Sequence, residues 1–175
     1  MKAPIIETGR LVLQPLSLNH LSQDYINWLN DPDVTMYMES GGNYNLEQLR
    51  NFLEEQERKD ILFWAIHIKE SNKHIGNIKI DPINISENSG EYGIMMGDKL
   101  EWGKGYAKEA SINIINYCFK KIGFSKITLG VVEDNISAVE LYIRLGFKIV
   151  SKNNNTGMYQ GKLCNSIRMV LVNGE

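Results

Sequence analysis

Apolar residues alternate with polar ones, or run together, in several short segments of this chain, and such segments are typical of β-strands. They are residues 10–16, 63–68, 74–80, 91–96, 126–132, 147–151 and 165–172. Four longer segments repeat their apolar residues at helical spacing instead. These are residues 18–29, 45–58, 105–122 and 135–145. The pattern predicts an α/β protein whose mixed sheet of about seven strands is flanked by about four helices.

Residues with capping or turn preferences stand at the ends of these expected elements. Asn45 and Asn135 can cap the second and fourth helices, and Gly123 can end the third. The polar segments 81–90 and 152–162 are expected to be loops. Segment 34–44, rich in Met, Tyr and Gly, is either the lid of a pocket or an ordinary connection. No linker, repeat or low-complexity segment interrupts the pattern, so residues 1–175 are expected to form a single domain.

Residues 91–110 carry the strongest local signal for function. The apolar run at residues 92–96 predicts a buried strand, and the sequence WGKGYA at residues 102–107 then leads into the third helix. Unpaired amides and the positive end of the helix dipole suit such a helix N-terminus to an anion. Glycine lets the main chain approach that anion closely. Taken alone, a pair of glycines before a helix is more often a plain turn.

The spacing of these glycines excludes two better-known phosphate-binding loops. The third glycine of G-x-G-x-x-G is replaced by Lys108, and no Gly-Lys-Ser/Thr follows at P-loop spacing. The strand–helix–strand unit over residues 91–132 instead implies parallel pairing with a right-handed crossover. Ligands bind at the carboxyl ends of parallel strands. Two independent arguments therefore place an anionic ligand at residues 103–105.

Composition narrows the class of protein without identifying it. The chain of 175 residues is 43% hydrophobic and 23% charged, as soluble globular domains are. Its net charge of -2 gives no basic surface for nucleic acid, and no apolar run is long enough for a membrane span. Cys118 and Cys164 lie far apart in sequence, which argues against a disulfide framework and favours the cytoplasm. His20, His67 and His74 lack metal-ligand spacing, so they are expected to be structural or surface residues and no metal is expected.

A further motif follows the strand at residues 126–132. It reads Asn135-x-x-Ala138-x-x-x-Tyr142 and continues to Gly146-Phe147. The ordered combination of strand, W-G-K-G-Y-A loop, helix, second strand, N-x-x-A-x-x-x-Y and L-G-F resembles the GCN5-related N-acetyltransferase (GNAT) superfamily. Within it, the chain looks most like the branch of the ribosomal-protein alanine acetyltransferases. The resemblance spans residues 10–171 and implies a transferase that moves the acetyl group of acetyl-coenzyme A (acetyl-CoA) to an amine.

The resemblance also implies how acetyl-CoA would bind. One main-chain segment would hold its pyrophosphate, and another would pair with its pantetheine arm as an added strand does. The first consists of Gly103, Lys104, Gly105, Tyr106 and Ala107, and the second of Ile94, Met95 and Met96. Trp102 replaces the glutamine or arginine of many family members but is usual in the branch named above. Asn135 would touch the coenzyme in addition to capping its helix, or serve only as the cap.

Two side chains are implied to be catalytic. Tyr142 stands where the family often places a general acid, and its hydroxyl could protonate or stabilise the departing thiolate. The alternative is an aromatic residue that packs against the core. Glu91 is the candidate base for the protonated amine, because partial burial would make its carboxylate a stronger base. The alternative for Glu91 is a solvated carboxylate at the end of a strand.

The acceptor is less well defined by the sequence. Glu39 could attract a cationic amine, and Tyr37 and Tyr44 could line its pocket. No cysteine lies in the motifs, so we expect direct attack by a primary amine within a ternary complex. The amine could belong to a protein N-terminus, an amino sugar, a polyamine or an antibiotic. The competing functions are a non-catalytic acyl-CoA-binding sensor and a purely structural domain, and a homodimer through the last strands is compatible with the sequence.

Overall fold

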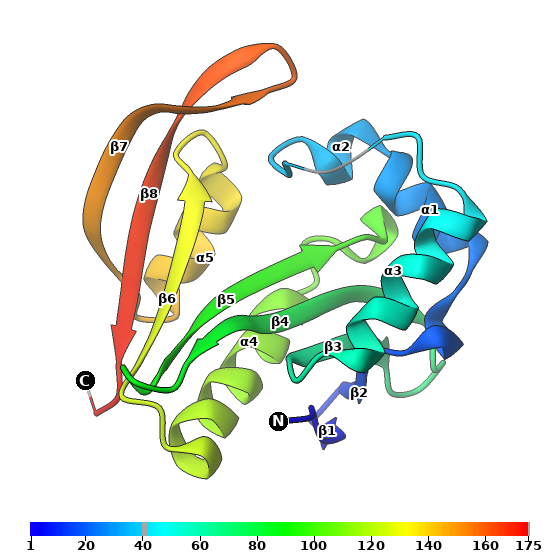
Figure 1. The fold of residues 1–175 in the computed structure, drawn as a ribbon, viewed down its shortest axis with the longest axis horizontal. Helices are drawn as coiled ribbons and strands as arrows, with labels where there is room; N and C mark the ends of the chain where they lie inside the picture. The colour runs from blue at the N-terminus through cyan, green and yellow to red at the C-terminus, as the bar shows by residue number, and fades with distance from the viewer. Residues whose placement is uncertain (40–41, 175) are drawn as a thin grey trace.

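A computed structural model describes residues 1–39 and 42–174 of the chain. The strands form one eight-stranded sheet in the order β1-β2-β3-β4-β5-β6-β8-β7 (Figure 1). Their bounds are β1 (Ile6–Glu7), β2 (Leu11–Pro15), β3 (Leu62–Ile68), β4 (His74–Asn84), β5 (Ser89–Met96), β6 (Lys126–Val132), β7 (Lys148–Tyr159) and β8 (Lys162–Val172). All neighbours pair antiparallel except β5 and β6, which are parallel. The expected α/β fold with a mixed sheet is therefore confirmed.

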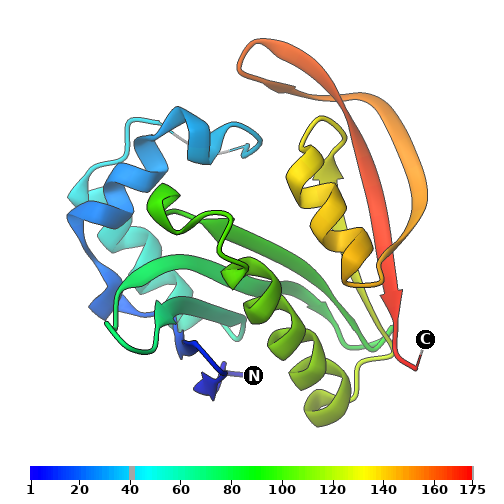
Figure 2. The same cartoon turned by 180° about the vertical axis from the view of Figure 1, so that it is seen from behind.

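Helices cover both faces of this sheet (Figures 1 and 2). On one face lie α4 (Tyr106–Tyr117) and α5 (Ile136–Arg144), and on the other lie α1 (Gln23–Asn30) and α3 (Leu46–Arg58). Shorter turns complete the connections: η1 (Leu18–His20), α2 (Pro32–Thr35), η2 (Lys99–Glu101) and the π-helical η3 (Cys118–Ile122). None of the helices described is long and apolar enough to cross a membrane.

Two hydrophobic cores hold these layers together. The larger packs Trp64, Tyr92 and Ile114 between the sheet and the helices α4 and α5. The smaller lies beneath α1 and α3, where Leu49 and Leu53 are fully buried one turn apart on α3. This spacing is the apolar stripe that an amphipathic helix needs in order to dock on a sheet.

Gly97 fixes how closely α1 approaches the end of β5. A Cβ atom at Gly97 would lie 2.1 Å from the indole ring of Trp28, which is less than any tolerated carbon–carbon contact. Only glycine therefore lets Trp28 pack over the point where the chain leaves β5 toward the glycine loop, which consists of residues 102–107. The packing of α1 and the position of that loop are coupled through this one residue.

Several boundaries expected from the sequence are confirmed. Asn45 caps α3 in a reciprocal capping box with Gln48, and Asn135 caps α5 by accepting a hydrogen bond from the amide of Ala138. Gly123 ends the third helical segment in the left-handed region, at φ 85°. The buried thiol of Cys118 behaves as a small hydrophobic group, and burial raises its pKa to about 12.

Two expected loops are strands instead, and β1 is an additional strand. Segment 81–90 continues β4 and starts β5, with only residues 85–88 between them. Segment 152–162 belongs almost wholly to β7 and β8, which turn at Gln160 and Gly161 with positive φ. The polar sequence is tolerated because β7 is the exposed edge strand, so it carries no alternation of apolar residues.

The other differences concern the first half of the chain. The helix expected at residues 18–29 is split into η1 and α1, and Ser22 caps α1. Segment 34–44 begins within the short helix α2, and Ser40 and Gly41 of this segment lie outside the described residues.

Candidate active site

The sheet divides between β5 and β6. These strands pair only from Ser89 to Glu91, opposite Lys126 to Thr128. Beyond Glu91 they diverge, as Figure 1 shows, because β6 continues along β8 while β5 stays with β4. Over the described residues, the edge of β5 from Tyr92 to Met96 therefore has no strand partner on this side. Apart from the Met96 carbonyl, which accepts a hydrogen bond from Trp102, the backbone groups along this edge can pair with an extended ligand.

The glycine loop lies at the carboxyl end of this open strand. Gly103 and Gly105 both adopt positive φ, at 75° and 82°, and Gly105 is the N-cap of α4. No side chain caps α4, so the first amides of the helix are available to an anion. Trp102 anchors the loop to the strand, because its indole nitrogen donates a 2.8 Å hydrogen bond to the carbonyl of Met96. The structure thus places the two expected coenzyme-binding segments beside each other.

Arg10, on the segment before β2, supports the glycine loop from outside the motif. Its Nη1 donates to the carbonyl oxygen of Lys104 at 2.9 Å, and its guanidinium lies 4.5 Å from the ring centre of Tyr106. Its Nε also pairs with Glu109 of α4 at 2.7 Å. Burial raises the pKa of Glu109, but hydrogen bonds from Thr8 and Arg10 outweigh burial and lower the pKa overall. The carboxylate therefore stays charged and fixes Arg10 against the loop.

Tyr142 of α5 lies in the larger hydrophobic core and packs against Tyr92 of β5. Its side chain is only 7% exposed, and its ring packs edge-on against Tyr92 and Phe147 at 5.6 and 6.0 Å between centres. Among the described residues, its hydroxyl has no hydrogen-bond partner. Burial raises the pKa of Tyr142 to about 12, so the phenol keeps its proton at neutral pH. The hydroxyl can therefore act as a hydrogen-bond donor to a ligand.

Glu91 stands where β5 and β6 separate, and its carboxylate is paired with a guanidinium. Both carboxylate oxygens accept hydrogen bonds from Arg168 of β8, at 2.8 and 3.0 Å. The pair crosses β6 above Gly130, where a Cβ atom would lie 3.0 Å from the Nη1 of Arg168. These hydrogen bonds raise the pKa of Arg168. The pair is about two-thirds buried and ties β5 to β8 at the apex of the opening.

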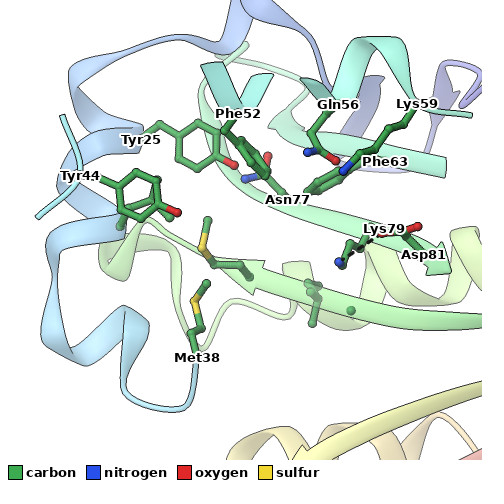
Figure 3. A pocket seen from close by; sticks show the side chains of 14 residues that line it. Tyr25, Met38, Tyr44, Phe52, Gln56, Lys59, Phe63, Asn77, Lys79 and Asp81 are labelled. Atoms are coloured by element: carbon green, nitrogen blue, oxygen red, sulfur yellow. Dashed lines mark ion pairs between the residues drawn. The ribbon is translucent and has the colours of Figure 1, made fainter. Parts of the chain in front are cut away.

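The residues expected to bind the acceptor separate into different places. Tyr44 lines a cavity of about 430 Å³ beneath α1 and α3, shown in Figure 3. Tyr37 lies elsewhere, and its hydroxyl donates to the carbonyl of Asp134 just before α5, at 3.1 Å. Glu39 is exposed and does not line this cavity. The wall of the cavity includes Met95 and its neighbours on β5, so it adjoins the open edge of that strand.

The three histidines, distant in sequence, form one cluster beside this cavity. The ring centres of His20, His67 and His74 lie 5.1 to 5.3 Å apart. Burial lowers the pKa of His20 and lowers that of His74 to about 4. Within the described chain, no group of three or more His, Cys, Asp or Glu side chains could hold a metal ion. His74 donates to Asn77 instead, and Asn77 lines the cavity.

The sequence pointed to the glycine loop and to Glu91, but it did not point to the side chains that contact the loop, Glu91 and the cavity wall. Arg10, Arg168 and Asn77 carry no local motif, and each meets its partners only in the folded chain. A weak signal exists for Asn77 alone, because a polar residue inside the apolar run of β4 interrupts a buried strand.

Comparison with known proteins agrees with this geometry. Residues 10–148 match the family model described as the acetyltransferase (GNAT) domain. The chain is 26% identical over 149 residues to the uncharacterized N-acetyltransferase YoaA of Bacillus subtilis, with 83% of each protein covered. It is 28% identical over 147 residues to the uncharacterized N-acetyltransferase p20 of Bacillus licheniformis, covering 81% of this chain and 80% of that protein.

Solved structures share the fold over almost the whole chain. A GNAT-family acetyltransferase from Bacillus anthracis superposes with a TM-score of 0.86 at 18% identity, covering 98% of this chain and all of that one. The spermidine N-acetyltransferase of Vibrio cholerae, in complex with CoA and spermine, also gives a TM-score of 0.86, at 21% identity and with coverage of 95% and 97%. Because the family model matches well over half of its residues, the chain belongs to the acetyltransferase (GNAT) family and is an N-acetyltransferase.

Proposed function

We propose that this enzyme transfers the acetyl group of acetyl-CoA to a primary amine by direct attack within a ternary complex. The observation that carries the proposal is the open edge of β5, which ends at the uncapped N-terminus of α4. An extended arm with a terminal pyrophosphate matches that combination of a strand edge and an anion site. The two glycines with positive φ bring no side chain of their own to this loop.

The main chain would hold the coenzyme in two places. Residues 103–107 would bind the pyrophosphate, and Ile94 to Met96 would pair with the pantetheine arm. Space supports this assignment, because a Cβ atom at Gly103 would meet no other atom within 4 Å. Asn135 lies at the start of α5, across the opening from β5, and we assign it a coenzyme contact in addition to its role as N-cap.

The chemical step needs a proton donor for the departing thiolate sulfur and a base that takes a proton from the attacking amine. As the amine nitrogen forms its bond to the acetyl carbon, the carbon–sulfur bond breaks and its electron pair leaves with sulfur. The free, protonated hydroxyl of Tyr142 would donate to that sulfur, and solvent would restore its proton. The proton lost by the amine would pass to the base.

We propose Glu91 as that base, under a restriction that its ion pair imposes. Both of its oxygens are engaged by Arg168, so the carboxylate would accept the proton through a water molecule or after the guanidinium has moved. If Glu91 is instead only a tie between β5 and β8, solvent would take the proton. The two roles predict different dependence on pH.

The acceptor is proposed to be a protein N-terminus or a small-molecule amine. The WGKGYA loop supports a place near the ribosomal-protein alanine acetyltransferases, and the likeness to a spermidine N-acetyltransferase supports a small amine. The proposed location is the cytoplasm, which suits the free, buried thiols of Cys118 and Cys164.

The proposal is tested by coenzyme binding and by turnover. Thermal denaturation with and without acetyl-CoA should show a rise in midpoint, because a ligand that binds only the folded state stabilises it. Release of free thiol across a panel of primary amines, followed by mass spectrometry of the products, should reveal an acetylated acceptor. Binding without release on any amine would mean a coenzyme sensor, and no binding would overturn the proposal.

A further inference from the structure

The cavity beneath α1 and α3 is placed to receive the acceptor, and its lining indicates what kind of amine fits. Gly93, Ile94 and Met95 of β5 line it, and Ile94 and Met95 also belong to the segment to which the pantetheine arm is assigned. An acceptor held there would lie next to the donor. This inference rests on the proposed function and concerns the class of amine.

Six of the fourteen described residues that line the cavity are aromatic or contain sulfur. Figure 3 shows Tyr25 and Tyr44 at one end, with Phe52 and Phe63 along the side formed by α3 and β3, and Met38 opposite them. The rings of Phe52 and Phe63 meet edge to face, with their centres 6.3 Å apart. Such a wall favours an apolar or aromatic body through area burial and ring contacts.

Asn77 adds one buried donor to this apolar wall. The His74 Nε2 atom lies 3.0 Å from the carbonyl oxygen of Gly76 and 2.9 Å from the Oδ1 of Asn77. A carbonyl oxygen only accepts, so that nitrogen carries the proton and Asn77 must present its oxygen to it. The Nδ2 of Asn77 is then left with no partner, although the side chain is only 3% exposed. Buried amides without a partner are rare, and one in a cavity wall suits an oxygen atom of a ligand.

The charges around the cavity disfavour an acceptor with several positive charges. Among its described lining residues, Asp81 is the sole carboxylate, and Lys59 and Lys79 contribute two ammonium groups. The Asp81 carboxylate is already opposed by Lys79, at 3.7 Å. A polyamine would need several unpaired carboxylates to replace the water around its charges.

We propose that the acceptor is a primary amine with a single positive charge, a large apolar or aromatic body, and an oxygen atom that accepts a hydrogen bond from Asn77. An apolar amino acid amide and the first residue of a peptide both have this chemistry. The apolar body fills the space between Phe52, Phe63 and Tyr44, and the amine faces β5.

Matched acceptors test each part of this proposal on the full chain. Phenylalaninamide and 2-phenylethylamine share an aromatic ring and an amine, but only the first has the carbonyl oxygen. We expect kcat/KM, measured as thiol release from acetyl-CoA, to be about tenfold higher for phenylalaninamide because of that hydrogen bond. Spermidine should fall at least about tenfold below phenylalaninamide, because its extra charges lose their water without replacement. The dipeptide Phe-Ala shows whether the source is a peptide or a free small molecule.

Two variants of Asn77 identify the donor. Asn77→Leu removes the amide, and Asn77→Asp keeps an oxygen for His74 while replacing the donor with a carboxylate. In both variants the ratio of kcat/KM for phenylalaninamide to that for 2-phenylethylamine, measured at one pH, should fall by about tenfold relative to the unmodified enzyme. The shift in unfolding midpoint with acetyl-CoA should be unchanged, because Asn77 lies outside the coenzyme cradle.

The outcomes separate this inference from the function on which it rests. If spermidine is acetylated at least as well as phenylalaninamide, or if both Asn77 variants keep the ratio, the acceptor class is wrong while the acetyltransferase stands. The same holds if another amine is acetylated and phenylalaninamide is not. If acetyl-CoA gives no stabilisation and no amine releases thiol, the proposed function itself fails.

Discussion

Tyr142 and Tyr92 are buried neighbours that differ in what their hydroxyls do. The hydroxyl of Tyr92 is hydrogen-bonded to Ser111 at 2.7 Å, whereas that of Tyr142 has no partner among the described residues. Their rings are in edge-on contact, so both experience similar packing. The pair therefore offers a matched comparison between a structural tyrosine and the proposed acid.

The first prediction is that Tyr142→Phe lowers kcat by about 10²-fold or more, because the departing sulfur loses its donor. Coenzyme affinity should change less than about twofold, since no hydrogen bond of the free enzyme is removed. The control, Tyr92→Phe, should cost about 1 kcal/mol of stability through the lost Ser111 hydrogen bond and leave kcat nearly intact. Stopped-flow thiol release and calorimetric coenzyme binding provide the two measurements. Parallel loss of kcat and coenzyme affinity in Tyr142→Phe would make this residue structural.

The second prediction concerns the pair of Glu91 and Arg168. If Glu91 is the base, Glu91→Gln should lower kcat/KM by about 10²-fold near neutral pH, and the deficit should shrink at higher pH as the amine loses its proton unaided. Arg168→Met should lower activity less, because the carboxylate remains. The pH profile of kcat/KM distinguishes the two roles. Equal deficits for both variants at every pH would indicate that the pair only joins β5 to β8.

At the scale of elements, Gly103 of the glycine loop can be compared with Gly161, a glycine in a closely similar environment. Gly103 and Gly161 have nearly the same positive φ, 75° and 77°, and an added Cβ atom would meet nothing within 4 Å at either. Gly103 lies in the proposed cradle, whereas Gly161 lies at the tip of the β7–β8 hairpin.

The third prediction follows from this match. Alanine at either glycine should lower the free energy of unfolding by a similar amount, about 1 kcal/mol, because the left-handed backbone strains any residue with a Cβ atom. Only Gly103→Ala should also weaken acetyl-CoA binding, by about tenfold, because its methyl group stands where the phosphates approach the main chain. Calorimetric titration with acetyl-CoA measures this difference. Equal affinity in the two variants would remove the pyrophosphate from this loop.

The elements that sequence predicts well are those whose signals are local. Asn45, Asn135 and Gly123 act within one helical turn, so the ends of α3, α5 and the third helical segment could be read from a few residues. The pattern predicts only the start of β7, as far as Ser151. The polar rest of this strand gains order from pairing with β8 rather than from its own preferences. Arg10 was missed for the same reason, since it meets Lys104 across 94 positions of sequence.

At the scale of the whole molecule, the fold makes one opening and ties its two sides together. The sheet splits at Glu91, the β4–β5 side carries the glycine loop and the cavity, and the β6–β8 side carries α5 with Tyr142. Among the described residues, two hydrogen bonds bridge the sides away from the apex, from Tyr37 to Asp134 and from Gln160 to Pro32. Tyr37, expected to contact the acceptor, is thus placed to hold the opening at a fixed width.

The last prediction, also at this scale, is that the enzyme loses stability in mild acid through its histidine cluster. Burial holds the pKa of His74 at about 4 in the folded chain, below its ordinary value of 6.5, and also lowers that of His20. Between pH 6.5 and pH 4, His74 is mostly protonated in the unfolded chain but mostly neutral in the folded chain. Stability is therefore fully present above pH 6.5 and falls as the pH drops toward 4. His74 alone should contribute a loss of about 2 kcal/mol between pH 7 and pH 5.

Urea denaturation at a series of pH values measures this loss, and His74→Gln should flatten the curve between pH 7 and pH 5. Carboxylates hardly titrate in that window, so the slope there reports mainly the histidines. As the control, Glu87→Gln removes the exposed partner of Lys126, and it should change stability little while leaving the slope as it is. An unchanged slope in His74→Gln would mean that this histidine takes up its proton without opposing the fold. The hydrogen bond from His74 to Asn77 would be kept in either case, because the Nε2 atom carries a proton in both charge states of the ring.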